Sequence, residues 1–188
     1  MLDGAHSDAR GHSAPARRRL GPRQVYFGNG PREGVRQLTY QAVAKGKIDV
    51  AAALCTARGL RLTQQRKAVL LHLLAAGRPL SAYDILAAVR PREPSLTPAS
   101  TYRCLDFLVE HGLAHRLETL RAFVACDHPE HPHAGQFLIC RQCGTVVETD
   151  DTRVADAADR LCRSQGFEIE AKTIELTGLC GPCIAPPR

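Results

Sequence analysis

The sequence of 188 residues contains no Trp and a single Met, and aromatic residues make up 5% of it. Its cores must therefore be built from aliphatic side chains, and the hydrophobic content of 44% is sufficient for one or two globular domains. No apolar run is long enough to cross a bilayer, and the basic N-terminus lacks the apolar core of a signal peptide. These absences argue against a membrane or secreted protein and predict a cytoplasmic one.

The eight cysteines are the most informative residues that are present. Without an export signal they favour reduced thiols that bind metal over a disulfide framework. Four of them form two CxxC pairs, Cys140-Arg141-Gln142-Cys143 and Cys180-Gly181-Pro182-Cys183. Four thiolates can surround one zinc ion tetrahedrally and leave no open position for catalysis. The pairs therefore predict a structural zinc site, with a redox dithiol as the alternative.

The net charge of +6 is unevenly distributed along the chain. Residues 46–125 carry eleven Lys and Arg against six Asp and Glu, whereas residues 126–188 carry six against ten. A basic middle beside an acidic end suggests that the middle faces a polyanion such as nucleic acid. An ordinary solvated imbalance remains open on charge alone.

Local signals divide the chain into three parts. Residues 1–45 are rich in Gly, Pro, Arg and Ser and lack sustained periodicity, so they predict a disordered basic arm. Between residues 46 and 125, apolar residues recur at helical spacing, Thr63, Ser81 and Thr97 are candidate N-caps, and two alternating segments follow. The expected helices cover residues 48–57, 63–77, 81–90 and 97–112, and the expected strands cover 113–117 and 122–125. Capped helices followed by a β-hairpin are the order of a winged helix-turn-helix domain.

Residues 126–188 predict a different architecture. Two strands are expected at 136–140 and 145–149, hinged on the first CxxC pair, then a helix capped by Asp151 and a strand at 167–176. This order leaves an open sheet with an exposed edge, which is often paired with its copy in a homodimer.

A recognition helix that begins at Thr97 would present its first residues to base edges in the major groove. Arg103 can fork onto guanine, Tyr102 can touch a thymine methyl or a phosphate, and Ser100 and Thr101 suit phosphate oxygens. Basic residues around the next helix upstream would follow the DNA backbone: Arg61, Arg66 and Lys67. The competing interpretation packs Tyr102 in the core and gives Arg103 a surface ion pair.

A second cluster of metal-binding residue types comes from separate elements: His115, Cys126, His133 and Glu148. One Cys, two His and one Glu form a mixed tetrahedral site whose thiolate favours zinc over iron or manganese. Such a site would link both halves of the chain. Taken singly, each residue also fits a solvated or buried position without metal. His128 and His131 lie outside this set and form either a weak extra site or a solvated loop.

Three segments resemble the ferric uptake regulator family, and its zinc uptake regulator branch in particular: residues 60–66 (LRLTQQR), 100–105 (STYRCL) and 137–144 (FLICRQCG). The resemblance implies structural zinc at the four CxxC cysteines, a regulatory zinc at His115, Cys126, His133 and Glu148, and base contact by Tyr102 and Arg103. Iron sensors of the family carry Asp-His where this sequence has Gln136-Phe137, which argues against iron.

The combined expectation is an α+β protein with a winged helix-turn-helix domain at 46–125 and a small αβ dimerisation domain at 126–188. It implies a non-enzymatic, zinc-responsive repressor that binds two Zn²⁺ per chain, double-stranded operator DNA and a second copy of itself, with no substrate other than metal ion. The alternatives are an iron- or peroxide-sensing repressor on the same scaffold, a zinc-ribbon interaction protein and a thiol redox protein.

Overall fold

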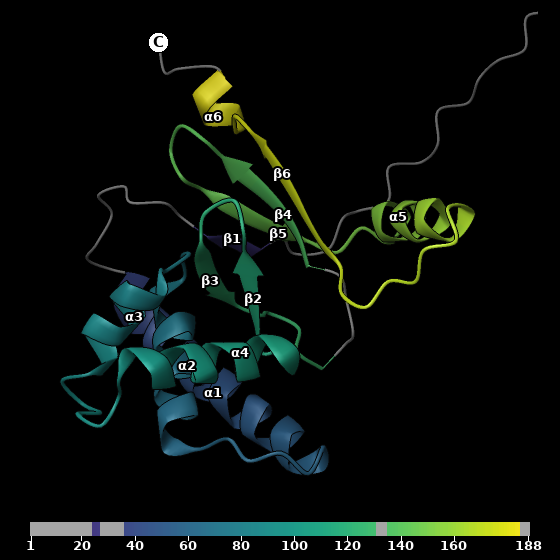
Figure 1. Cartoon of the computed structure of the whole chain (residues 1–188). Coiled ribbons are helices and arrows are strands. Elements are labelled where there is room, and N and C mark those ends of the chain that lie inside the picture. The colour runs from purple at the N-terminus through teal and green to yellow at the C-terminus, as the bar shows by residue number, and fades with distance from the viewer. Residues whose placement is uncertain (1–23, 27–35, 131–134, 185–188) are drawn as a thin grey trace, which may run out of the picture.

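The computed structural model describes residues 24–26, 36–130 and 135–184. It is an α+β structure in which four helices pack together, a β-hairpin stands on them, and a four-stranded sheet follows (Figure 1). The helices are α1 (Arg36–Ala57), α2 (Gln64–Ala76), α3 (Ala82–Val89), α4 (Pro98–Glu110), α5 (Thr152–Ser164) and α6 (Gly181–Ile184). The strands are β1 (Gln24–Tyr26), β2 (Ala114–Leu117), β3 (Ala122–Ala125), β4 (Gly135–Cys140), β5 (Val146–Thr149) and β6 (Thr173–Gly178).

The predicted caps of the helical domain are confirmed. The side chains of Thr63, Ser81 and Thr97 accept hydrogen bonds from backbone N–H groups in the first turns of α2, α3 and α4. Gly77 and Gly112 follow α2 and α4 in the left-handed region, with φ of 57° and 69°. Local chemistry therefore sets where these helices begin and end.

Helix α1 begins twelve residues before the expected start at residue 48, inside the segment predicted to be a disordered arm. That prediction was wrong for this part of the arm, and residues 1–23 and 27–35 lie outside the described ones. The helix continues through Gly46 because Ala44, Ile48 and Cys55 lie on one buried face. Burial of such a face outweighs the roughly 1 kcal/mol that a glycine costs within a helix.

The main core lies between α1, α2, α3 and α4 and the hairpin, and is built from aliphatic side chains as the composition predicts. Its fully buried members include Val69, Leu73, Ile85, Leu105 and Leu108. The hairpin β2–β3, here called the wing, is antiparallel with Ala114 opposite Ala125. Leu80 pairs with Phe123 through two backbone hydrogen bonds of 2.8 and 3.0 Å and so fixes the wing on the helices.

The C-terminal sheet has the strand order β1-β5-β4-β6, with β6 parallel to β4. Its edge strand β1 comes from the segment predicted to be disordered, which is a second correction to that prediction. Strand β6 begins at Thr173 rather than at the expected residue 167. Residues 167–172 instead connect α5 to the sheet, and Phe167 is 67% exposed.

Helix α5 packs little apolar surface within its own chain. None of its residues is buried, although Val154 and Leu161 are exposed apolar side chains on it. Figure 1 shows α5 standing to one side of the sheet. Within the described residues, no helix is long and apolar enough to cross a membrane.

Candidate metal centres and nucleic-acid interface

The two CxxC pairs come together in one cluster, here called the four-cysteine cluster: Cys140, Cys143, Cys180 and Cys183. Their sulfur atoms all lie within 4.8 Å of one another, and the Sγ atoms of Cys143 and Cys180 are 3.6 Å apart. Gly144, at φ 71°, donates its N–H to the Cys140 carbonyl at 2.9 Å and closes the first turn. The N–H of Arg141 donates to the Gly178 carbonyl at 3.0 Å and ties the two pairs together. Four convergent thiols are the donor set that structural zinc requires.

The thiols of the four-cysteine cluster differ in acidity. Hydrogen bonds from the backbone N–H groups of Cys143 and Cys180 lower the pKa of Cys140 to about 6. The side-chain hydrogen bond with Cys180 raises the pKa of Cys183 to about 12. A divalent cation that binds these sulfurs would displace the protons that they carry.

The second candidate centre, here called the interdomain cluster, contains His115, Cys126 and Glu148. One ligand atom from each lies within 4.8 Å of the others, and His115 Nε2 is 3.2 Å from Glu148 Oε1. His115 is on β2, Cys126 follows β3, and Glu148 is on β5, so the wing and the C-terminal sheet both contribute. The fourth predicted ligand, His133, and the extra candidate His131 lie outside the described residues.

The sequence interpretation missed one residue that shapes the interdomain cluster, Gly135 at the start of β4. A Cβ atom at this position would lie 2.9 Å from His115 Nδ1 and 2.7 Å from the Phe137 ring. The rings of Phe137 and His115 meet edge to face, with their centroids 5.3 Å apart. Gly135 therefore leaves the space in which Phe137 orients the histidine. The only available signal was a glycine at a strand start, which is not specific.

The two residues that follow Gly135 in β4, Gln136 and Phe137, also bear on which metal the interdomain cluster can bind. Gln136 is buried, donates from Nε2 to the Asp151 carbonyl at 2.9 Å and accepts from Thr149 Oγ1 at 3.3 Å. Phe137 is 1% exposed. The two residues that stand in place of an Asp-His pair are therefore packing and hydrogen-bonding residues, and Phe137 offers no ligand atom.

Proton competition at the interdomain cluster gives a testable pH dependence. Burial favours the neutral imidazole of His115, but hydrogen bonds with Cys126 and Glu148 outweigh this and raise its pKa to about 9. At pH 7 a metal ion must displace this proton, so metal affinity should rise with pH until about pH 9. We expect the zinc affinity of this cluster to rise roughly tenfold per pH unit for each proton released. Competition with a chromophoric chelator at about pH 6, 7 and 8 measures this, and an affinity independent of pH would contradict it.

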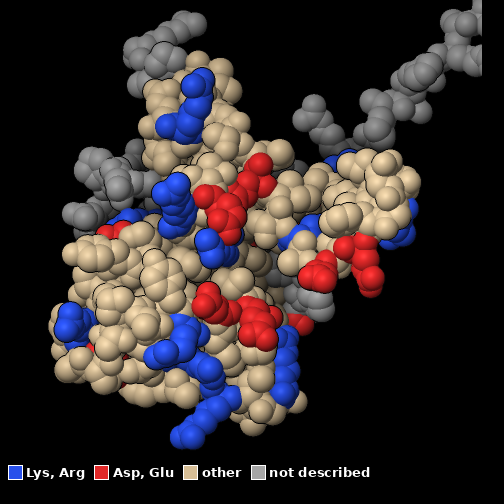
Figure 2. All heavy atoms as spheres, in the orientation of Figure 1, with Lys and Arg blue, Asp and Glu red and all other residues tan. Residues whose placement is uncertain are grey.

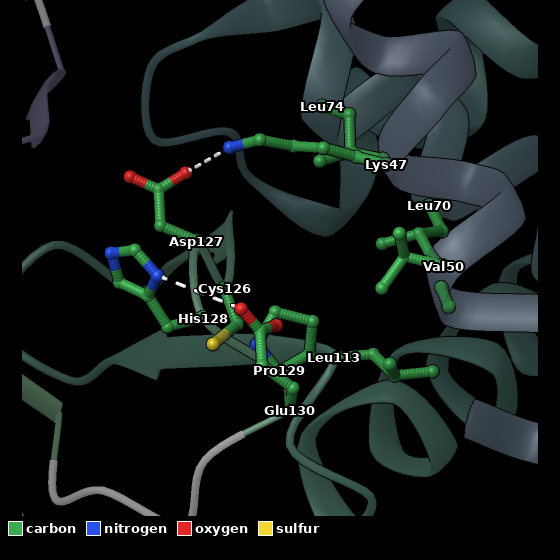
Figure 3. Close-up of a pocket in the computed structure, with 11 residues that line it drawn as sticks. Lys47, Val50, Leu70, Leu74, Leu113, Cys126, Asp127, His128, Pro129 and Glu130 are labelled. Atoms are coloured by element: carbon green, nitrogen blue, oxygen red, sulfur yellow. Dashed lines mark hydrogen bonds and ion pairs between the residues drawn. The ribbon is translucent and has the colours of Figure 1, made fainter. Parts of the chain in front are cut away.

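A pocket of about 290 Å³ lies beside Cys126, between the helices and the segment that leads out of the wing (Figure 3). Lys47 of α1 and Asp127 both line it, and Lys47 Nζ lies 2.5 Å from the Asp127 carboxylate. Arg58, just after α1, donates to the carbonyls of His111 at 2.9 Å and Pro129 at 3.3 Å. The residues that follow Cys126 are thus tied to α1 and to the residue just after it.

The candidate DNA surface is formed by the N-terminal parts of the helices. Tyr102 and Arg103 are exposed on α4, so Tyr102 does not pack in the core, and Arg61 and Lys67 are exposed near α2. Figure 2 shows several Lys and Arg side chains across the helical part of one face. Sequence reasoning missed Tyr83, which is 78% exposed in the first turn of α3. Its exposure, invisible in the sequence, makes it a second aromatic candidate for base contact.

Three residues predicted to contact DNA make contacts within the protein. Ser100 completes the capping box with Thr97, and Thr101 Oγ1 donates to the Thr97 carbonyl at 2.9 Å. Both side chains are buried, at 8% and 1% exposure, so neither is presented to a phosphate in this structure. The Arg66 guanidinium stacks 3.5 Å from the centre of the Phe107 ring and donates to the Arg61 carbonyl at 2.7 Å. The Arg66 side chain therefore makes contacts within the fold, and Arg66 is only partly exposed.

The chain matches the model of the ferric uptake regulator family over residues 57–177. The chain belongs to this family. It is 37% identical over 135 residues to the zinc uptake regulation protein of Escherichia coli K12, covering 71% of this chain and 79% of that protein. The zinc uptake regulation protein of Mycobacterium tuberculosis H37Rv is 30% identical over 131 residues, covering 68% and 98%.

Solved structures of family members agree with this assignment. A zinc uptake regulator complexed with zinc and DNA is 35% identical, with a TM-score of 0.70 over 75% of this chain and 95% of that one. The holo form of the regulator XcZur is 39% identical, with a TM-score of 0.67 over 74% and 97%. The family's mixed helical and sheet architecture is therefore the architecture of this chain.

Proposed function

We propose that the protein is a zinc-responsive transcriptional repressor that binds operator DNA as a metal-loaded homodimer and silences genes of zinc uptake. The interdomain cluster carries this proposal, because its ligands come from the wing on one side and from β5 on the other. A metal held there fixes the angle between the DNA-binding and C-terminal domains. The similarity to regulators named for zinc uptake supports zinc as the metal.

Two zinc ions per chain have different roles in this proposal. The four-cysteine cluster holds the first and stabilises the end of the C-terminal sheet. The interdomain cluster, completed by His133, holds the second and responds to the free zinc concentration. Linkage requires that operator DNA tighten zinc binding at this cluster by the same factor as zinc tightens DNA binding.

The homodimer follows from the surface that one chain leaves open. Val154 and Leu161 on α5, Phe167 after it and Leu176 on the edge strand β6 are exposed apolar side chains. A second copy can cover this surface in a symmetric pair, which places two winged-helix domains on successive half-sites. We assign residues 126–188 to this dimerisation domain and residues 46–125, together with the earlier part of α1, to DNA binding. A repressor that binds operator DNA would act in the cytoplasm, where that DNA lies.

The metal selectivity of operator binding tests the proposal against an iron or peroxide sensor. Protein with an intact four-cysteine cluster is loaded with zinc, iron(II) or manganese(II), and operator affinity is measured at fixed salt. We expect zinc to give the tightest binding, because Cys126 is a soft ligand and Phe137 supplies none. Stronger activation by iron or manganese would refute the zinc assignment. A thiol enzyme is disfavoured because all four CxxC sulfurs converge in one cluster.

Arg103→Ala should weaken operator binding by about 1–3 kcal/mol and relax specificity at one base position, because an arginine fork onto guanine is lost. Tyr83→Phe keeps the ring and tests the hydroxyl, whereas Tyr83→Ala should weaken binding further. Arg90→Ala, on the exposed end of α3, is a charge-matched comparison for Arg103. Equal effects of Arg90→Ala and Arg103→Ala would show a general charge contribution instead of base recognition.

A further inference from the structure

The turn of the wing is bound by a carboxylate from the C-terminal sheet. Glu175, in β6, accepts a hydrogen bond from the N–H of Glu118 at 2.7 Å and another from the N–H of Thr119 at 2.9 Å. The donors precede Glu175 by 57 and 56 residues. These bonds therefore join the DNA-binding part of the chain to the dimerisation part.

The geometry is that of an anion held by consecutive backbone N–H groups. One carboxylate oxygen serves each N–H, both distances are those of charge-assisted hydrogen bonds, and such bonds are about twice as strong as neutral ones. The turn that offers these groups is closed independently by the N–H of Arg121, which donates to the Glu118 carbonyl at 3.2 Å. The turn can therefore form without Glu175, and the carboxylate determines where it lies.

Glu175 is placed between the two candidate metal centres. In the sheet it lies opposite Phe137 of β4, whose ring contacts His115 of the interdomain cluster. Along the chain it precedes Cys180 of the four-cysteine cluster by five residues. The strand that carries the carboxylate therefore pairs beside a neighbour of the interdomain cluster and leads into the four-cysteine cluster.

We infer that Glu175 is a positioning residue for DNA binding. Its carboxylate holds the wing turn on β6, so the orientation of the wing depends on the position of the metal-loaded sheet. This inference rests on the proposed function. Glu175 does not bind metal or DNA in this role. It determines whether metal occupancy produces the wing orientation that fits the operator.

The two hydrogen bonds from the wing turn to Glu175 are here called the clamp. One variant changes its acceptor and another removes one of its donors. Glu175→Gln keeps the side-chain size, but its carboxamide presents an NH₂ group to one of the two N–H donors. Thr119→Pro deletes one donor at the second position of the turn, where the fixed φ of proline is readily accommodated. Glu168→Gln, at an exposed glutamate before β6, is the charge-matched control.

The experiment measures zinc content, hydrogen exchange at the Glu118 amide and operator affinity with and without zinc at the interdomain cluster. We expect both clamp variants to retain the zinc content of the wild type and to exchange the Glu118 amide faster. With saturating zinc they should bind the operator about tenfold more weakly, within the usual range of coupling between sites. Glu168→Gln should match the wild type in every measurement.

Unchanged Glu118 exchange in both variants would show that no clamp exists in solution. Faster exchange with unchanged or tighter operator binding would show that the clamp does not position the wing for DNA. Both results overturn the inference. If the wild type itself fails to respond to zinc, the proposed function fails, and the exchange comparison still decides whether Glu175 holds the wing.

Discussion

Cys180→Ser will unfold the C-terminal sheet. Four thiolates converge in the four-cysteine cluster, and zinc binding to such sites is worth on the order of 10–16 kcal/mol, which exceeds the stability of a typical small domain. Few other interactions compensate, because α5 has no buried residue and most of β6 is exposed. We expect the variant to lose one zinc per chain, the dimer and the cooperative unfolding transition, as measured by metal analysis, sedimentation and circular dichroism.

Cys162→Ser is the matched control for this loss, because Cys162 lies on α5 outside both clusters and is partly exposed. It should retain the zinc content and the unfolding transition of the wild type. A Cys180→Ser protein that keeps its zinc and unfolds cooperatively at an unchanged temperature would show that the four-cysteine cluster is not a structural centre.

Cys126→Ser will separate zinc from DNA binding while leaving the fold intact. The substitution removes the single thiolate of the interdomain cluster but keeps the volume of a buried side chain that is 3% exposed. Zinc should bind the remaining ligands weakly, so the zinc-dependent gain in operator affinity, expected in the range of about 5–150-fold, should be lost. Operator titrations at matched free zinc measure this gain, and metal analysis checks that the zinc of the four-cysteine cluster is retained.

Cys162→Ser again provides the control, and it should keep the full zinc response. Retention of the response by Cys126→Ser would mean that the interdomain cluster does not sense zinc. Loss of zinc from the four-cysteine cluster in Cys126→Ser would instead show that the two centres are not independent.

The parts of this structure that sequence predicts are those set by local chemistry. Thr63, Ser81 and Thr97 cap their own helices, and each CxxC pair closes on itself through nearby backbone hydrogen bonds. Capping residues and ligand spacings act over a few positions, so they can be recognised without the fold.

The parts that sequence did not predict depend on contacts between distant segments. Helix α1 continues through Gly46 because its face is buried by other helices, and β1 is a strand because β5 pairs with it. Ser100 and Thr101 have side chains suited to phosphate, but Ser100 completes the capping box of α4 and Thr101 donates to the Thr97 carbonyl. Gly135 and Glu175 acquire their roles from the positions of His115 and of the wing turn. No spacing in the chain encodes these contacts.

In the proposed mechanism, occupancy of the interdomain cluster controls DNA binding. This control is tested most directly by titrating zinc into protein that holds zinc only in the four-cysteine cluster, while zinc occupancy and operator affinity are followed in the same samples at fixed salt. We expect operator affinity to rise in step with the second zinc ion per chain. An operator affinity that stays constant as this second zinc binds would contradict the proposed mechanism.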